Sequence, residues 1–365
     1  MGLFKAKQKG SDGAGSKDSH LDMTGGSIWR NMVAFAVPVF LGQLFQQLYN
    51  TADSIIVGNF SGKGALAAVS SSGNLIFMMT GFFMGLTLGA GVVISRYFGA
   101  RDYKAMEAAV HTNIAFGAVC GVLMSALGFF LAPQMLILMN TPADVLPLSI
   151  TYFRLYFLGA FFTLMYNTCM SILRAVGDSR TPLYYLIFSS VVNVVFDLIF
   201  VGPLRMGVAG AAIATVISQA VSAAMCFAKL LRSTGPERVV FRNIRFDMPM
   251  LRQIAGQGIP SGVQNSIISI ANVVVQSNIN AFGSDAMAGC GSYAKVEGFV
   301  FLPITAFTAA ITTFIGQNLG AGEHERAKRG ARFGIFCAMA LAELFGVILY
   351  FICPPVIRIF NSDPA

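Results

Sequence analysis

The amino-acid sequence predicts an all-α integral membrane protein built from two parallel six-helix repeats, with twelve helices expected and about nine present in these 365 residues. Three observations predict this fold. First, 55% of the residues are hydrophobic and only 12% are charged, so the chain has more apolar surface than a soluble core requires. Second, the basic residues fall mainly on one side of the apolar runs. Third, one sequence pattern recurs at a fixed interval along the chain.

Nine apolar runs are the candidate membrane spans. Each is close to or longer than the roughly 20 residues that a helix needs to cross the hydrocarbon, and a helix satisfies its own backbone hydrogen bonds there. Pro38, Pro260 and Pro303 fall within runs, where helices in lipid tolerate proline as a bend. The runs are bounded by charged residues or by Gly and Pro. They cover residues 31–57, 66–94, 105–139, 146–173, 182–201, 207–230, 250–281, 287–315 and 329–360.

The basic residues predict how these spans are oriented. The amino-terminal segment and alternate loops hold twenty of the Lys and Arg residues, whereas the other side holds only Lys63, Arg205 and Arg358. Basic loops stay in the cytoplasm, so we expect a multi-pass protein of the bacterial cell membrane, surrounded by the lipid bilayer, with a cytoplasmic amino terminus. The net charge of +8 does not indicate a nucleic-acid partner, because the charges lie in short loops and not on one soluble face.

An internal repeat relates the two halves of the chain. The segment RYFGARD, residues 96–102, resembles QNLGAGE, residues 317–323, so that Gly99 matches Gly320 at an offset of 221 residues. Gln43 and Gln264 match at the same offset. An even number of helices per copy gives both copies the same orientation in the membrane. A second copy as long as the first would end near residue 453, so we expect the chain to stop before the fourth helix of that copy.

The repeat also predicts the domain organisation. Residues 1–27 are rich in Gly, Ser, Lys and Asp, which is too polar for a signal peptide and indicates a disordered cytosolic tail. Residues 28–232 form the first lobe with helices one to six. Residues 233–248 form a cytosolic linker between the lobes, and residues 249–365 form a partial second lobe with helices seven to nine.

Several short motifs lie at the centres and ends of these spans. They are Pro38 with Gln43 and QQLYNTAD at 46–53, GAR at 99–101, LRAVGD at 173–178, Asn193 with Asp197, and GQNLGA at 316–321. In these motifs the chain resembles the MATE (multidrug and toxic compound extrusion) transporters of the bacterial DinF-like and MepA-like branch. The resemblance extends over essentially the whole chain after the tail. It implies a MATE-like fold of two lobes facing a central cavity, with export driven by the inflow of Na⁺ or H⁺.

Few carboxylates lie inside the predicted spans. Of the 17 acidic residues, only Asp53, Asp197, Glu297 and Glu343 do so. A buried acid in lipid costs several kcal/mol unless it is paired or protonated, so each of the four is a candidate functional residue. Glu343 matches a valine in the first repeat, and we expect it either to be structural or to pair at the lipid interface.

Two of these acids, Asp53 and Asp197, are expected to share a coupling site with Asn193 and Thr215. Asn193 and Asp197 are spaced i, i+4 on one helix face. At a rise of 1.5 Å per residue, all four side chains lie about 6–13 Å from the outer ends of their helices. Two carboxylates, an amide and a hydroxyl suit Na⁺, or the carboxyl pair can share a proton. Family members place a cation or proton site on the matching residues.

The alternative is a hydrogen-bonded cluster that only packs the lobe, and Thr215 in particular could bond its own helix backbone. Asp53 matches Val274 in the second repeat. The expected site therefore belongs to the first lobe alone.

A second set of polar residues predicts a wet cavity between the lobes. The first span carries these polar residues at helical spacing, with either Gln46 or Gln47 facing inward. The seventh span carries polar residues at a similar spacing. The alternative is hydrogen bonding between helices. The residues expected to line the substrate cavity are Gln43, Gln47, Asn50, Asn167, Asn272, Gln276 and Glu297, and Tyr166 is expected to line it beside Asn167.

These expectations predict a monomeric secondary active antiporter, without a cofactor, that exports amphipathic cationic drugs or toxic compounds in exchange for Na⁺ or H⁺. The alternative in the same superfamily is a flippase for lipid-linked oligosaccharides. Such a protein needs cationic residues in its cavity, and the predicted interior offers only Arg154 and Lys295 against four acids. An intramembrane enzyme is not indicated, because the three histidines lie in the tail or near loops.

Overall fold

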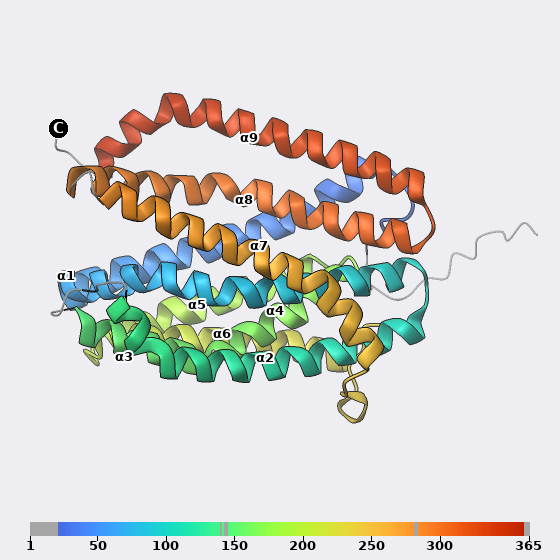
Figure 1. The fold of residues 1–365 in the computed structure, drawn as a ribbon, viewed down its shortest axis with the longest axis horizontal. Coiled ribbons are helices and arrows are strands. Elements are labelled where there is room, and N and C mark those ends of the chain that lie inside the picture. The colour runs from blue at the N-terminus through green and yellow to red at the C-terminus, as the bar shows by residue number, and fades with distance from the viewer. Residues whose placement is uncertain (1–20, 139–140, 142–144, 281–283, 361–365) are drawn as a thin grey trace, which may run out of the picture.

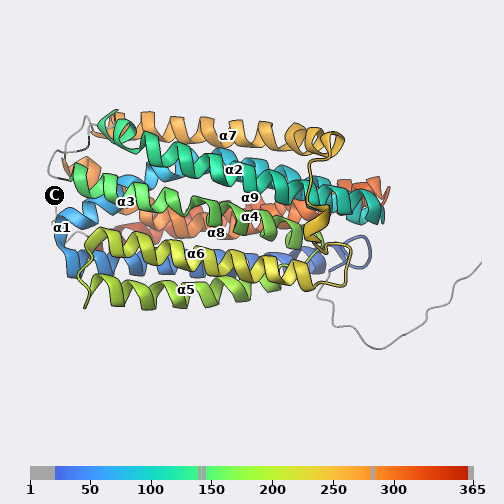
Figure 2. The ribbon, with the colours of Figure 1, turned by 90° about the horizontal axis from the view of Figure 1, so that it is seen from below.

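The computed structural model describes residues 21–138, 141, 145–280 and 284–360. These residues form nine α-helices and one short 3₁₀ helix, η1, without any strand (Figure 1). The helices run roughly parallel or antiparallel to a common axis, and α5 and α7 lie on opposite faces of the bundle (Figure 2). Their bounds are α1 Ile28–Gly99, α2 Tyr103–Leu138, α3 Leu146–Leu158, α4 Ala160–Ala175, α5 Arg180–Val201, α6 Gly207–Arg232, η1 Phe241–Asn243, α7 Met248–Asn280, α8 Ser284–Gly320 and α9 His324–Phe360.

The predicted spans 31–57 and 66–94 both belong to α1, which folds back on itself. A straight helix of this length would place its ends about 107 Å apart. Instead, both ends of α1 lie near Gln317 of the second lobe. Met23, just before the start of α1, donates its N–H to the Gln317 side chain, and Gly99, the last residue of α1, lies against the Gln317 carbonyl oxygen. The two membrane-spanning stretches are Ile28–Ser61 and Met79–Gly99. We call them the first and second arms of α1; they are blue and cyan in Figure 1.

The predicted span 146–173 is not one straight helix. It is divided into α3 and α4, which meet at Gly159 with a bend of 44°. Gly159 lies so close to Val216 of α6 that a Cβ atom would overlap the valine side chain. The bend therefore brings the α3–α4 junction against α6, where only glycine leaves enough space.

Each of the remaining predicted spans corresponds to one helix. One of these helices, α7, is less apolar than a typical membrane span. Within the described residues, seven helices or arms are long and apolar enough to cross a membrane, and the bent pair α3–α4 makes an eighth. The one remaining predicted span, 250–281, is α7, which has the length, at 33 residues, but not the apolar composition. Its polar residues include Gln257, Asn265 and Asn272.

The first lobe has a closely packed core beneath its basic loops. Ile94 from the second arm of α1, Val110 from α2, Ile172 from α4 and Leu230 from α6 belong to one cluster, and each is buried. Lipid is as apolar as these side chains, so close packing stabilises the cluster more than exclusion from water does.

The two lobes meet where the second arm of α1 crosses α7 through paired glycines. Gly85 and Gly89 are spaced four residues apart, as are Gly258 and Gly262 on α7. A Cβ atom on Gly85 would overlap the backbone of Gly262, and one on Gly89 would overlap the backbone of Gly258. Small residues at this spacing let two membrane helices approach at backbone distance, so these four glycines set the separation of the lobes.

A second contact between the lobes closes the end of the bundle that holds the basic loops, here called the basic end. Gln317 of α8 accepts a hydrogen bond from Met23 N–H at 3.0 Å and donates one from Nε2 to Ala175 O of α4 at 2.9 Å. Asn318 donates to Met23 O, and Arg326 donates to the carbonyls of Met23, Gly25 and Gly26. We call these contacts the Gln317 clasp. It joins the amino-terminal segment, the first lobe and the second lobe.

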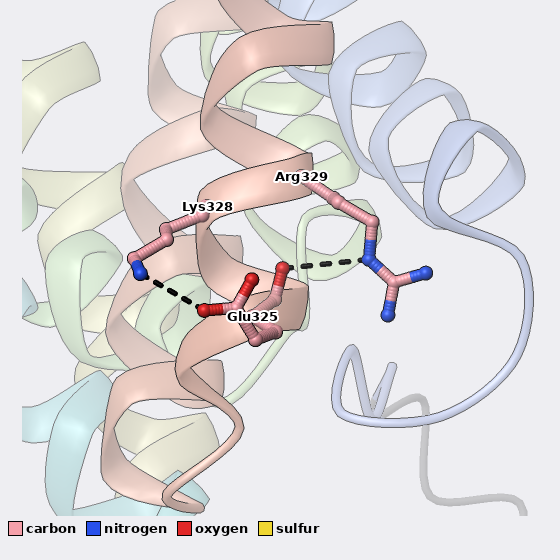
Figure 3. A network of polar contacts seen from close by, with 3 residues as sticks. All are labelled: Glu325, Lys328 and Arg329. Carbon is pink, nitrogen blue, oxygen red and sulfur yellow. Dashed lines mark hydrogen bonds and ion pairs between the residues drawn. The ribbon is translucent and has the colours of Figure 1, made fainter.

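The charged start of α9 at the same end is only weakly held. Lys328 Nζ lies 2.9 Å from Glu325 Oε1, and Arg329 Nε donates to the Glu325 carbonyl at 3.4 Å (Figure 3). The side chains of Lys328 and Glu325 are 65% and 77% exposed. Such exposed pairs contribute roughly 0–1 kcal/mol, so this network adds basic charge to the surface more than it stabilises the fold.

Replacing Gln317 by Leu is expected to loosen the clasp. The change leaves Met23 N–H and Ala175 C=O without their partner, at about 1–3 kcal/mol for each buried group. We expect amide hydrogen exchange of residues 21–27 to be at least about tenfold faster, since 1.4 kcal/mol corresponds to tenfold. Gln253→Leu is the matched control, because Gln253 bonds Tyr97 at 2.9 Å in an exposed position. Equal exchange rates in the two variants would contradict a role for Gln317 in this closure.

Candidate functional site

The predicted coupling acids come together inside the first lobe. Asp53 lies on the first arm of α1 and Asp197 near the end of α5, and their carboxyl groups lie close enough to interact with each other. Asp53 is 7% exposed and Asp197 is fully buried. Two carboxyl groups this close cannot both carry an unscreened negative charge, so the pair needs either a shared proton or a cation.

Asn193 lies one turn before Asp197 and is also fully buried. Both amide atoms of Asn193, both carboxyl oxygens of Asp197 and Oδ1 of Asp53 are buried without a hydrogen-bond partner among the described residues. Buried polar atoms nearly always have a partner. Four of these five atoms are oxygens, and four unpartnered oxygens on three neighbouring residues fit a site for Na⁺ or a proton.

Thr215 differs from the other three residues of this set, because its side chain has a hydrogen-bond partner. Its hydroxyl donates to Ala211 O at 3.0 Å, which is the local bond that the sequence allowed as the alternative. The oxygen keeps lone pairs, and Thr215 lines the central cavity next to Asp53. The described residues contain no cluster of three or more His, Cys, Asp or Glu that could hold a metal. The donor set of two carboxyls, an amide and a hydroxyl therefore suits a hard monovalent ion more than a transition metal.

A cavity of about 420 Å³ lies between the lobes, within the usual size range of small-molecule sites. Helix α1 contributes both arms to its wall, and α3, α4, α5, α6 and α8 contribute the rest. Gln43 also reaches across to α8, where it accepts a hydrogen bond from the Thr305 hydroxyl at 2.8 Å. The sequence-predicted residues in the wall are Gln43, Asn50, Asp53, Asn167 and Thr215.

The structure places the other predicted cavity residues differently. Gln46, not Gln47, lies in the wall, because adjacent residues on a helix point about 100° apart and only one can face inward. Gln47 instead approaches Gly298 of α8. Asn272 is exposed and does not line the cavity. The side chains of Gln276 and Glu297 lie outside the described residues.

Sequence reasoning identified Tyr166 but missed the rest of the aromatic side of the cavity. Tyr49, Tyr152, Tyr156 and Tyr166 all line it, and the rings of Tyr152 and Tyr156 stack with their centroids 6.4 Å apart. Tyr49 also accepts a hydrogen bond from Gln219 at 3.4 Å. A helical stripe along α3 and α4 was the available signal. It consists of Tyr152, Tyr156, Thr163, Tyr166, Asn167, Met170 and Arg174.

The stripe ends with a basic residue that the sequence assigned to a loop. Arg174 lies in the last turn of α4 and lines the cavity. The expected interior cations were Arg154 and Lys295. Arg154 does not line this cavity and lies over the Phe129 ring at 5.3 Å, whereas the side chain of Lys295 lies outside the described residues. Glu343 is exposed on α9.

A helical membrane protein with two lobes, a buried carboxyl pair and a polar and aromatic cavity has the architecture of a membrane transporter. The MatE family model matches residues 38–199 and 260–365. The chain therefore belongs to the MATE family of membrane transporters, as its motifs indicated.

Curated relatives and solved structures support the same assignment. The chain is 30% identical over 344 residues to the probable multidrug resistance protein YoeA of Bacillus subtilis, covering 92% of this chain and 74% of that protein. It is 25% identical over 355 residues to a FAD transporter of Shewanella oneidensis, covering 95% and 77%. The structure matches a MOP superfamily transporter from Pyrococcus furiosus with a TM-score of 0.88 at 25% identity, covering 97% and 78%.

Proposed function

We propose that the protein is a secondary active antiporter that exports amphipathic, cationic small molecules in exchange for Na⁺ or H⁺. The observation that carries this proposal is the Asp53–Asp197 pair, which lies where the cavity wall meets the interior of the first lobe. An ion taken up by the pair would change the charge of the wall beside the substrate. Competition between ion and substrate follows from this position.

The exchange would proceed by alternating access. The ion and the substrate would favour different arrangements of the two lobes, since a ligand shifts a conformational equilibrium only by its difference in affinity for the two states. The Gln317 clasp closes the basic end in the present arrangement. We take that end to be cytoplasmic, in line with the excess of basic residues, and we take the protein to act as a monomer.

The cavity favours drug-like molecules over lipid-linked oligosaccharides. Its described wall contains one basic residue, Arg174, together with four tyrosines and several amides. Aromatic rings with a polar edge bind flat amphipathic molecules well. A carrier of pyrophosphate-linked sugars would need several cations to neutralise its cargo. The relatives include a probable multidrug resistance protein and a FAD transporter, which supports a small-molecule cargo.

The proposal is tested with the purified protein in proteoliposomes loaded with ethidium, a fluorescent lipophilic cation. The Na⁺ and pH gradients are imposed separately, and each is collapsed with its own ionophore as the control. We expect one gradient to accelerate ethidium movement in the direction opposite to the ion. Movement at the same rate with and without either gradient would show that the protein is not an ion-coupled antiporter.

A further inference from the structure

Arg174 is a charge in the cavity that the coupling site does not use. It lines the cavity near its basic end, beside Ser171 and Ala175. Asp53, the acid in the same wall, lies toward the other end. The wall extends from Thr80 to Val92 on α1 and from Thr163 to Ala175 on α4, which is about 18 Å along each helix at 1.5 Å per residue. The cavity therefore has a basic residue, Arg174, near one end and an acidic residue, Asp53, toward the other.

The surroundings of Arg174 leave its charge available to a ligand. Its Nε is buried and has no hydrogen-bond partner among the described residues. Asp178 lies one turn further along the chain. Its carboxyl group accepts hydrogen bonds from the backbone N–H groups of Arg180 and Thr181 and from the Thr181 hydroxyl, all in the first turn of α5. The C-terminal end of α4 favours a nearby cation, but this does not satisfy the directional N–H groups of a guanidinium.

A guanidinium in this position is suited to an anionic group. Arginine binds carboxylates and phosphates through charge-assisted hydrogen bonds, which are stronger than neutral ones and gain further strength where water is excluded. Tyr166, in the same wall, adds an aromatic surface beside it. An acid group bound here would point its molecule toward the tyrosines and Asp53.

We propose that Arg174 determines specificity by binding an anionic group of the transported molecule, so that the cavity accepts zwitterionic amphipaths as well as cations. This inference rests on the proposed transport function. The acid group would lie at the basic end of the cavity, the aromatic body along Tyr152, Tyr156 and Tyr166, and the cationic part toward Asp53.

The test uses two dyes that differ only in the acid. Rhodamine 110 carries a free carboxylate, and rhodamine 123 is its methyl ester. In proteoliposomes under the active gradient, we expect Arg174→Gln to reduce rhodamine 110 transport at least about tenfold, as for loss of a charge-assisted hydrogen bond, and to change rhodamine 123 transport less than about twofold. Arg174→Lys, which keeps the charge but not the planar fork, should give an intermediate loss.

Arg154→Gln is the matched control, since it removes a second arginine that does not line the cavity. We expect it to affect both dyes equally. Binding of each dye to the purified variants, measured by fluorescence anisotropy, separates a lost binding site from a misfolded protein. An equal change for both dyes in Arg174→Gln, or transport of the ester but not of the acid by the unaltered protein, would overturn the assignment of Arg174. Failure of the unaltered protein to move either dye or ethidium under any gradient would instead overturn the proposed function.

Discussion

Asp53→Asn and Asp197→Asn are each expected to abolish gradient-driven efflux, with a loss of roughly 100-fold or more, while the protein still inserts and folds. The two carboxyl groups lie close enough to interact, and three of their oxygens are buried without a hydrogen-bond partner among the described residues. An amide cannot take up a proton at this position or supply negative charge to Na⁺. An ion that binds both lobe arrangements equally well cannot shift the equilibrium between them. Substrate movement then becomes uncoupled from the ion gradient.

Efflux of a lipophilic cation from proteoliposomes measures this effect, and thermal unfolding of the purified variants measures folding. Glu343→Gln is the matched control, because it removes an acid from an exposed position on α9. We expect its efflux to match that of the unaltered protein. Undiminished efflux in both Asp variants would defeat the assignment of the coupling site.

The second large effect is expected from Gly258→Val at the crossing of α1 and α7. A Cβ atom at this position would meet the backbone of Leu86 at 2.8 Å, so the two helices must separate. Overpacking of a close contact costs about 1–3 kcal/mol, and more where the obstacle is backbone that cannot rotate away. We expect a lower unfolding temperature and a substantial loss of transport, because the lobes no longer meet at the required distance.

Gly256→Val provides the control on the same helix. Gly256 is exposed, and an added Cβ atom there would meet nothing within 4 Å. Both variants replace Gly by Val within the same helix, so the change in intrinsic helix propensity is the same in each. The difference in unfolding temperature between them therefore reports the contact with α1. The same unfolding temperature in both variants would refute the importance of this crossing.

The sequence was sufficient to predict the helices and to place Asp53 and Asp197 at similar depths in one lobe. Helix length, hydropathy and basic loops depend on local properties that can be read directly. Asp53 and Asp197 could be brought together because a helix rises by a fixed distance per residue, so counting from the span ends gives their depth. That count predicted depth but not facing direction, which the contact between the two carboxyl groups now provides.

The remaining features depend on tertiary contacts that local patterns do not specify. The bend at Gly159 follows from contact with Val216 of another helix. The choice of Gln46 over Gln47 depends on the rotation of α1, which two adjacent glutamines leave undetermined. Arg174 was assigned to a loop because the end of its helix was placed one or two residues early, an ordinary uncertainty at helix ends. That small shift removed a charge from the predicted cavity.

The Gln317 clasp has a consequence for how the basic end opens. One amide group makes both hydrogen bonds: its oxygen faces the amino-terminal segment and its nitrogen faces α4. Each bond holds the amide in the orientation that the other requires, so breaking one weakens the second. Opening at this end should therefore be cooperative and pass directly between a closed and an open form. A leak of small ions through a half-open intermediate would be suppressed by this single side chain.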